Sequence, residues 1–242
     1  RLGYARNKSV SILARDFLPT CNKNRLSTSV CSSCKLGKQP RLPFSQSVSK
    51  TSAPFQLVHC DLWTSPVPSF SSFQYYLVIL DDYSHYSWTF PLRNKSDTAD
   101  TVHRFFTYVL TQFHVVIQCM QCDNGGKFLT SSLRALFSSH GSSFRLSCPH
   151  TSPQNDKAER LIRTTNDIVR TLLIQATLPP PFWVEALHTA THLLNRRPFV
   201  KTTPYTPFFV LTGVHPRYDH LHVFGCLCFP NLYATSPHKL AP

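Results

Sequence analysis

Three carboxylates have the type and spacing to support metal-dependent chemistry. Asp61 occurs in V-H-C-D-L-W, Asp123 in Q-C-D-N-G-G and Glu159 in Q-N-D-K-A-E-R, with 35 residues between the second and the third. Acids are scarce in this chain, which has 12 Asp and Glu among 242 residues. Hard divalent cations such as Mg²⁺ prefer carboxylate oxygen, and a pair of them about 3.5–4 Å apart can drive displacement at a phosphodiester. The three acids therefore indicate a phosphoryl-transfer site.

The segments around these acids indicate how the fold would bring them together. Runs with strand-like composition cover residues 55–61, 75–80, 86–92, 114–122 and 143–147. Helical spacing covers residues 97–113, 131–138 and a long stretch that opens near 153–156. This order suits one central α/β sheet with helices on its faces, so we expect a mixed five-stranded sheet. Asp61 and Asp123 would close two strands, and Glu159 would lie near the start of a helix.

The helix that carries Glu159 has an apolar face and an adjoining polar stripe. At about 100° per residue, the apolar face comprises Ala158, Leu161, Ile162, Ile168, Val169, Leu172 and Leu173. The stripe beside it comprises Glu159, Arg163, Asn166 and Arg170. We expect nucleic acid to contact the last three of these, together with Lys157 and with Asn124 in the loop after Asp123. The alternative is that Glu159 and Arg163 form only an i,i+4 helix pair, worth a few tenths of a kcal/mol.

The charge balance favours a polyanionic partner. The chain has 25 Lys and Arg against 12 Asp and Glu, which gives a formal net charge of +13. Residues 1–50 contain ten of the basic residues and a single acid, Asp16, so the front of the chain is its most basic part. Nucleic acid is the leading partner, a membrane surface the second, and simple solubility the alternative. No apolar run approaches the roughly 18–20 residues that a membrane span needs.

Five motifs occur in an order that carries a family resemblance. They are D-L-W, L-D-D-Y-S, D-N-G-G, S-P-Q-N-x-x-A-E-R and F-W-x-E-A-x-x-T-A-x-x-L-L-N-R-x-P. Together they resemble the integrase region of a copia-type LTR retrotransposon polyprotein. The resemblance implies an RNase H-like core in which Asp61, Asp123 and Glu159 form the family's catalytic triad. It also implies two Mg²⁺ or Mn²⁺ ions at the triad, with Asp61 shared between both.

The resemblance further implies an activity, partners and a location. Such a protein trims the DNA ends of the long terminal repeats and joins them to target DNA. We therefore expect LTR ends and target DNA as partners, self-association when active, no membrane association, and a nuclear location after cytoplasmic synthesis. The nine cysteines, without a visible secretory segment, agree with reduced thiols in a cytosolic or nuclear setting. Because the first residue is Arg, we expect the chain to be a piece of a longer product.

Three segments are expected along the chain. Residues 1–46 would be a small basic module that resembles the GAG-pre-integrase module, 51–215 the catalytic core, and 216–242 a truncated C-terminal segment. Cys31 and Cys34 have metal-ligand spacing, and the resemblance makes them half of a His-His-Cys-Cys zinc site. Tyr4 stands where the family has the second histidine, and no histidine precedes His59. A structural zinc site needs four ligands, so we expect little zinc in this chain.

Departures from the family pattern keep other functions open. Asp156 stands where the family has Gly, three residues before Glu159, and Lys127 replaces a Glu outside the triad. One alternative is therefore an inactive relic that at most binds nucleic acid. Another is an RNase H-type nuclease that uses the same acids without strand transfer, although the motifs around the acids favour the integrase. We expect Asp81 and Asp82 to form a turn rather than to support the site.

Overall fold

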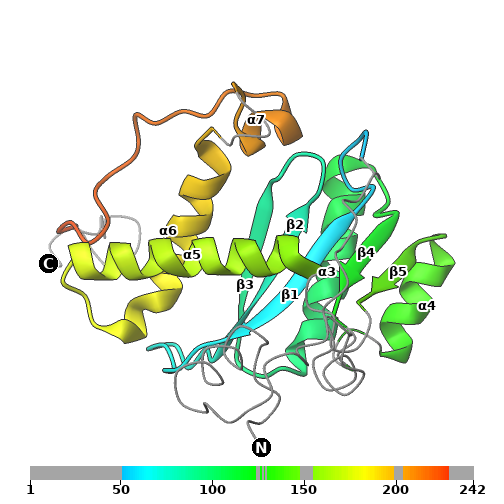
Figure 1. Cartoon of the computed structure of the whole chain (residues 1–242), viewed down its shortest axis with the longest axis horizontal. Helices are drawn as coiled ribbons and strands as arrows, with labels where there is room; N and C mark the ends of the chain where they lie inside the picture. The colour runs from blue at the N-terminus through cyan, green and yellow to red at the C-terminus, as the bar shows by residue number, and fades with distance from the viewer. Residues whose placement is uncertain are drawn as a thin grey trace, which may run out of the picture. The chain divides into compact units, whose positions relative to one another are not determined.

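The computed structural model describes residues 51–123, 126, 128, 130–147, 155–198 and 204–228, which all lie in one compact unit, Ser49–Pro242. The strands in this described part are β1 (Val58–Thr64), β2 (Tyr75–Asp81), β3 (Ser87–Leu92), β4 (Cys119–Cys122) and β5 (Ser143–Leu146). They form one sheet in the order β3-β2-β1-β4-β5. The pairs β1–β2 and β2–β3 are antiparallel, whereas β1–β4 and β4–β5 are parallel. The predicted mixed five-stranded sheet is confirmed (Figure 1).

Helices cover both faces of this sheet. Helices α3 (Asp97–Phe113) and α4 (Ser131–Ser139) pack on one face, and α5 (Asp156–Gln175) and α6 (Trp183–Arg196) pack on the other. A short 3-10 helix, Pro180–Phe182, immediately precedes α6. Helix α7 (Pro207–Thr212) follows α6 in the chain. Figure 1 shows α5 crossing the strands at the front of the sheet. Among the helices that the structure describes, none is both long enough and apolar enough to cross a membrane.

Local signals in the sequence set several helix boundaries. The hydroxyl of Thr130 caps α4 by accepting a hydrogen bond from the backbone N–H of Leu133. The hydroxyl of Thr206 caps α7 in the same way through the N–H of Phe209. Gly213 ends α7 with φ at 72°, in the left-handed region that glycine adopts without a Cβ clash. These boundaries are therefore encoded locally.

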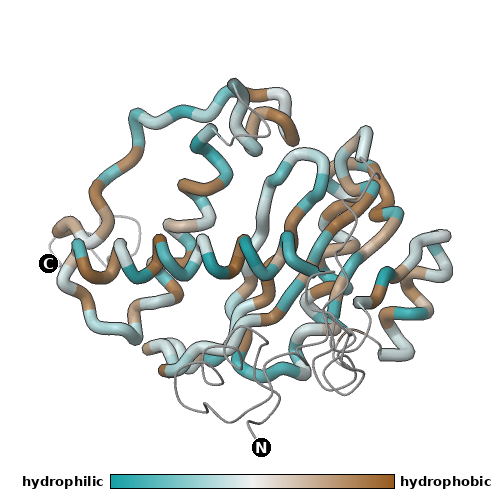
Figure 2. The backbone as a smooth tube through the Cα atoms, in the orientation of Figure 1, coloured by the Kyte–Doolittle hydropathy of each residue, from teal (hydrophilic) through white to brown (hydrophobic). Residues whose placement is uncertain are grey.

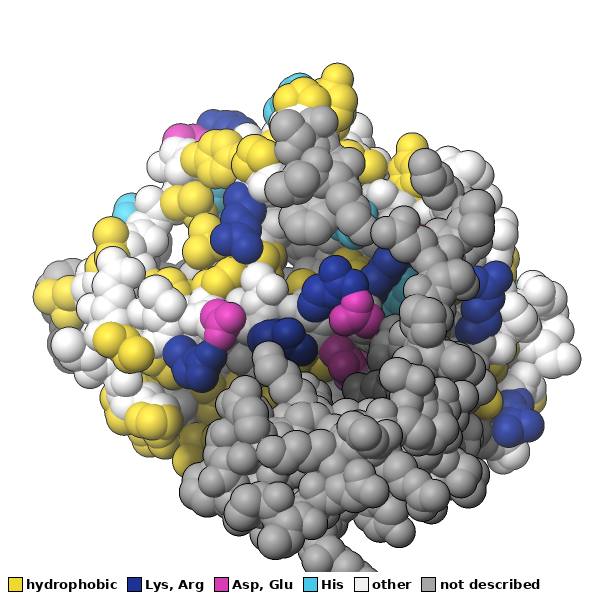
Figure 3. All heavy atoms as spheres, in the orientation of Figure 1, with side chains coloured by type: hydrophobic (Ala, Val, Ile, Leu, Met, Phe, Trp, Pro, Cys, Tyr) yellow, Lys and Arg dark blue, Asp and Glu magenta, His cyan; other side chains and the backbone are white. Residues whose placement is uncertain are grey.

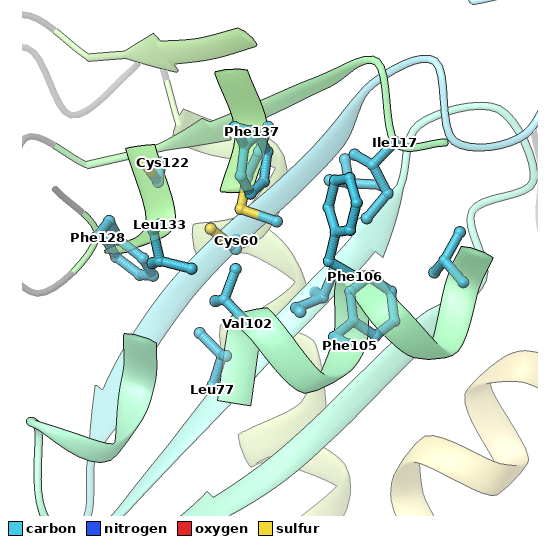
Figure 4. Close-up of a cluster of buried hydrophobic side chains, with 14 of the residues drawn as sticks. Cys60, Leu77, Val102, Phe105, Phe106, Ile117, Cys122, Phe128, Leu133 and Phe137 are labelled. Atoms are coloured by element: carbon cyan, nitrogen blue, oxygen red, sulfur yellow. The ribbon is translucent and has the colours of Figure 1, made fainter. Parts of the chain in front are cut away.

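Two apolar clusters bury the two faces of the sheet. Alternation along β2 divides its side chains, since Leu77 and Ile79 join the cluster under α3 while Tyr76 and Val78 join the cluster under α5. The cluster under α3 also contains Val58, Cys60, Val102, Phe105, Phe106, Leu133 and Phe137 (Figure 4). All seven residues of the predicted apolar face of α5 lie in or against the second cluster, which confirms that face. Figure 2 shows the resulting alternation of hydrophobic and hydrophilic segments along α5.

Three predicted elements differ from the structure. The first strand extends to Thr64, so Asp61 lies inside β1 rather than at its end, because residues 62–64 continue the pairing with β2. The strand expected over 114–122 covers only Cys119–Cys122, since His114 takes a left-handed φ of 54° that ends α3. The V-F-G-C-L-C-F run at 223–229 suggested a buried strand. Its described residues, 223–228, form no strand, and all but the half-buried Phe224 are exposed. An apolar run becomes a strand only where a neighbouring strand can pair with it.

Candidate functional site

The register between β1 and β4 indicates how Asp61 on β1 and Asp123, just after β4, are placed relative to each other. In the parallel pair β1–β4, Val58 is opposite Met120 and His59 is opposite Gln121. The same register continued by two residues places Asp61 opposite Asp123, which directly follows β4. Adjacent strands are about 4.8 Å apart, so the backbones of these two acids are close neighbours.

Both aspartates point toward the α5 face of the sheet. Cys60 and Cys122, the residues just before them, are fully buried in the cluster under α3. Successive side chains of a strand point to opposite faces, so Asp61 and Asp123 point away from that cluster. Asp61 is opposite Val78 of β2, which belongs to the cluster under α5. The two carboxylates therefore share the face that α5 covers.

The pKa of the Cys60 thiol is affected by both carboxylates. Burial raises this pKa well above the ordinary value, and the neighbouring side chains of Cys122, Asp61 and Asp123 raise it further. Both aspartates are thus near enough to act electrostatically on the same sulfur. A thiol whose deprotonation is opposed in this way is a poor nucleophile, so Cys60 is a packing residue beneath the acids.

Glu159 lies in the first turn of α5, at the end of the helix that is attached to β1. Its neighbour Ala158 is fully buried against the sheet. Asn155, the residue before the helix, donates from Nδ2 to the backbone carbonyl of Cys60 at 3.1 Å. The first turn of α5 therefore sits over the strand that carries Asp61. This arrangement brings the third acid to the same part of the sheet as the other two.

The donor set suits a hard cation in kind, because all three side chains offer carboxylate oxygen. Within the described residues, however, no three His, Cys, Asp or Glu side chains form a group that could hold a metal ion. The prediction that the three carboxylates converge on one acidic cluster open to solvent stays a prediction. Helix position fixes the Cα of Glu159, but three rotatable side-chain bonds decide where its carboxylate lies. The elements that carry the three acids are adjacent to one another. That the three carboxylates together bind metal ions stays a proposal.

Asp82 has partners in this region that the sequence did not indicate. It follows β2 and is buried, with 8% of its surface exposed. Its Oδ1 lies 2.9 Å from Nε2 of His59 on β1 and also accepts from the ammonium of Lys157 on α5. Its Oδ2 accepts from the hydroxyl of Thr51 at 3.2 Å. Asp82 was expected only to form a turn, and no local pattern indicates partners that lie so far away in the chain.

The pKa values of Asp81 and Asp82 move in opposite directions. Burial alone would raise the pKa of Asp82, but the hydrogen bonds from His59 and Lys157 and the charge of Lys157 bring it well below the ordinary value. Burial raises the pKa of Asp81, and hydrogen bonds from Ser84 and Phe55 offset only part of that rise. Asp81 accepts from Ser84 N at 2.8 Å and from Ser84 Oγ at 2.6 Å. The turn predicted at Asp81 is therefore confirmed, and Asp82 is the carboxylate that stays ionised.

The residues expected to contact DNA have different surroundings. Arg163 is exposed on α5. Arg170 pairs with Asp167 on the same helix, and Asn166 Oδ1 accepts from the hydroxyl of Tyr76 at 3.0 Å. Lys157 pairs with Asp82, so its ammonium already has an anionic partner. Figure 3 shows Lys and Arg side chains next to Asp and Glu side chains on the surface where α5 runs.

Several predicted site residues lie outside the described residues. Asn124 directly follows Asp123 in the sequence, and Cys31 and Cys34 belong to the front of the chain. Tyr4 and Lys127 are also outside the described part. Their expected roles in nucleic-acid or zinc binding therefore stay predictions.

Comparisons with known proteins agree with this geometry. The Integrase core domain family matches residues 51–152. The chain is 36% identical over 95% of its length to the "Retrovirus-related Pol polyprotein from transposon RE2" of Arabidopsis thaliana, and 31% identical over 99% to that from transposon TNT 1-94 of Nicotiana tabacum. It spans only 16% and 18% of those two polyproteins.

Solved structures show the same fold. The catalytic core domain of HTLV-2 integrase, in complex with magnesium and in a trimeric form, superposes with a TM-score of 0.52 over 67% of this chain and 99% of that one, at 13% identity. The intasome of simian T-cell lymphotropic virus, in complex with the PP2A regulatory subunit B56 gamma, gives a TM-score of 0.60 over 79% of this chain and 68% of that one, at 12% identity. The sheet and its helices therefore have the RNase H-like fold of retroviral integrase cores.

Proposed function

We propose that this chain, which has an integrase core domain and is homologous to plant copia-type Pol polyproteins, is the integrase part of such a polyprotein. Its reaction would be the trimming of LTR DNA ends and their transfer into target DNA. The observation that carries the proposal is the parallel pairing of β1, which carries Asp61, with β4, which Asp123 directly follows. The first turn of α5, which holds Glu159, is tied to the same strand.

The three acids define the roles that this reaction needs. Asp61, Asp123 and Glu159 would hold the Mg²⁺ or Mn²⁺ ions, and the bound metal would supply activation of the attacking oxygen and stabilisation of the leaving oxygen. The protein mainly positions the DNA for an in-line displacement, so no covalent intermediate with a side chain is required. Arg163, exposed one helical turn beyond Glu159, would hold a DNA phosphate near the acids.

DNA as a partner is supported by charge. The net charge of +13, with most of the excess in residues 1–50, favours attraction to a polyanion. We further propose that the active form is a homo-oligomer that works in the nucleus. Residues 1–46 would be a GAG-pre-integrase-like module whose zinc site, with Cys31 and Cys34, is degenerate. Residues 51–215 would be the catalytic core, and residues 216–242 would belong to a C-terminal segment.

One observation bears on the alternative of an inactive relic. Asp156, where the family has Gly, places an extra negative charge in the first turn of α5. In this structure its carboxylate pairs with the guanidinium of Arg160, which counters that charge. A negative side chain in the first turn also interacts favourably with the helix dipole. Asp156 is therefore compatible with an intact start of α5, and the integrase remains the better supported function.

A strand-transfer assay tests the proposal. The purified chain is incubated with a labelled LTR end, a plasmid target and Mg²⁺ or Mn²⁺, and the trimmed and joined products are measured. We expect both products from the natural sequence, and neither from Asp61→Asn, Asp123→Asn or Glu159→Gln. Asp167→Asn, an exposed acid on the same helix, is the matched control and should retain both products. Cleavage without joining would indicate the RNase H-type nuclease, and DNA binding without any product would indicate the relic.

A further inference from the structure

We propose that Asp82 is a positioning residue that sets Glu159 in register with Asp61 by holding His59 and Lys157 at the same time. The three residues are called the Asp82 clamp below. This inference rests on the proposed function, because it concerns two of the three acids in that reaction. The clamp joins strand β1, the turn after β2 and the first turn of α5 through one buried carboxylate.

His59 and Lys157, the two partners of Asp82 in the clamp, each lie two residues before one of the acids that the clamp would position. His59 lies two residues before Asp61 on β1, so both side chains point to the α5 face. Lys157 lies two residues before Glu159 in the first turn of α5. The same oxygen, Oδ1 of Asp82, meets both His59 Nε2 and Lys157 Nζ. If α5 shifted along or across β1, the bonds that join Lys157 and His59 through Asp82 would therefore break. This would happen before Glu159 had moved by one residue position relative to β1.

The hydrogen-bond roles within the clamp are defined by chemistry. An ionised carboxylate only accepts, so Nε2 of His59 carries the proton that it donates to Asp82. Nδ1 of His59 is buried without a hydrogen-bond partner among the described residues. The ring is therefore held through Asp82, and its position on β1 makes it a rigid reference point for the carboxylate. Charge-assisted bonds of this kind are shorter and stronger than neutral ones.

A second tether acts at the same turn. Asn155 is the N-cap residue of α5, yet its side chain makes no capping bond to the helix and donates instead to the carbonyl of Cys60. The Asn155 side chain therefore attaches the first turn of α5 to the sheet instead of capping the helix. Apolar contacts under the rest of α5 are non-directional and permit small sliding movements. Directional bonds from Asn155 and Lys157 supply the register that those contacts lack.

The other ion pairs of α5 cannot have this role. Arg160 pairs with Asp156 and Arg170 pairs with Asp167, and in both pairs the two partners belong to α5 itself. Both pairs are exposed, so they stabilise the helix only slightly and do not join it to another element. Their presence on the same helix provides a matched control for the clamp.

Hydrogen–deuterium exchange tests the tether without relying on activity. Variants Asp82→Asn and Lys157→Met keep side-chain volume close to the original, and Arg170→Met is the control. We expect faster exchange of the amides of residues 156–160 in the first two variants, with residues 165–175 unchanged. The double variant should be no worse than the worse single, because both remove the same bond. Unchanged exchange in residues 156–160 would overturn the clamp.

The metal requirement of DNA trimming tests the positioning role. Loss of a residue that orients a metal ligand typically weakens metal affinity or activity about 10–100-fold. We expect Asp82→Asn and Lys157→Met to raise the Mn²⁺ concentration needed for half-maximal trimming by about this factor, with Lys157→Arg restoring most of it. A purely structural role would lower the midpoint of thermal unfolding and leave this concentration unchanged, which would also overturn the clamp. Failure of the natural sequence to trim DNA would instead overturn the proposed function, and the exchange result would still decide the tether.

Discussion

At the scale of single residues, two adjacent aspartates show how surroundings decide ionisation. Asp81 is fully buried and its partners, Phe55 and Ser84, are neutral donors. Asp82 is also buried but meets the cation of Lys157 and the ring of His59. Desolvation penalises the charged form in both, and only at Asp82 do the partners outweigh it. Identical side chains at consecutive positions therefore have opposite linkage to pH.

Acid titration of stability should reveal this difference. The folded pKa of Asp82 is lowered, so its stabilisation is present above the unfolded value of about 4 and is lost as the pH falls toward the lower folded value. The gap in unfolding free energy between the natural sequence and Asp82→Asn should therefore shrink as the pH falls below about 4. The folded pKa of Asp81 is raised, so the gap for Asp81→Asn should shrink as the pH rises from about 4 through the higher folded pKa of Asp81. Urea unfolding at a series of pH values measures both, and parallel curves for the two variants would contradict the assignment.

At the scale of elements, hydrogen bonds from side chains of α6 attach this helix to β3, an edge strand of the sheet. Asn195 Oδ1 accepts from the N–H of Ser87 at 2.8 Å, and Asn195 Nδ2 donates to the carbonyl of Ser87 at 2.7 Å. Thr191 Oγ1 lies 2.8 Å from Thr89 Oγ1, two residues further along β3. β3 is an edge strand, and covering such an edge blocks pairing with another chain. The helix thus completes the sheet as well as its apolar core.

Removal of the Asn195 side chain should weaken the fold measurably. Asn195→Ala leaves a buried N–H and a buried carbonyl of Ser87 without these partners, and each such loss costs about 1–3 kcal/mol. We expect the free energy of unfolding to fall by at least that amount. Thr189→Ala on the same helix removes only a hydroxyl bonded to the carbonyl of Glu185 near the surface, and should change stability by less than about 0.5 kcal/mol. Equal losses for the two variants in urea unfolding would show that Asn195 does not hold α6 to β3.

At the scale of the whole molecule, the positive charge is divided between the basic front and the folded core. Residues 1–50 hold ten Lys and Arg against one acid. On α5, by contrast, Lys157, Arg160 and Arg170 each pair with an aspartate. Their charges are already partly countered before any DNA arrives. Non-specific attraction to DNA should therefore come mainly from the front, and the cations of α5 should act locally.

A salt titration of DNA binding separates these contributions. Each phosphate neutralised by the protein releases condensed counterion, so log affinity falls by about 0.9 per contact for each tenfold rise in salt. Removal of residues 1–50 should flatten this slope far more than the double variant Arg163→Ala/Arg170→Ala does. That double variant should instead reduce trimming at the correct phosphate. Equal slopes for the full chain and the shortened chain would mean that the charge of the front is only a solvated surface.

The sequence by itself determined the features that depend on neighbours in the chain. Periodicity predicted the five strands, the bounds of α3 and the whole apolar face of α5, because alternation and helical spacing repeat over a few residues. Motif spacing also predicted that Asp61, Asp123 and Glu159 belong to one region. Registers between strands were not needed for that prediction, although only the structure showed that Asp61 lies inside β1 rather than at its end.

Only the tertiary structure decided which distant groups meet. Asp82 finds His59 and Lys157 across 23 and 75 residues of chain, and Asn195 finds Ser87 across 108. The same separation explains why the sequence did not indicate that Lys157, which is expected to contact DNA, has Asp82 as a partner within the protein. It also explains the tail at 223–228, whose composition suits a strand but which pairs with no strand of the described sheet. Local composition states what a segment can form, whereas pairing and charge compensation depend on what the folded chain places beside it.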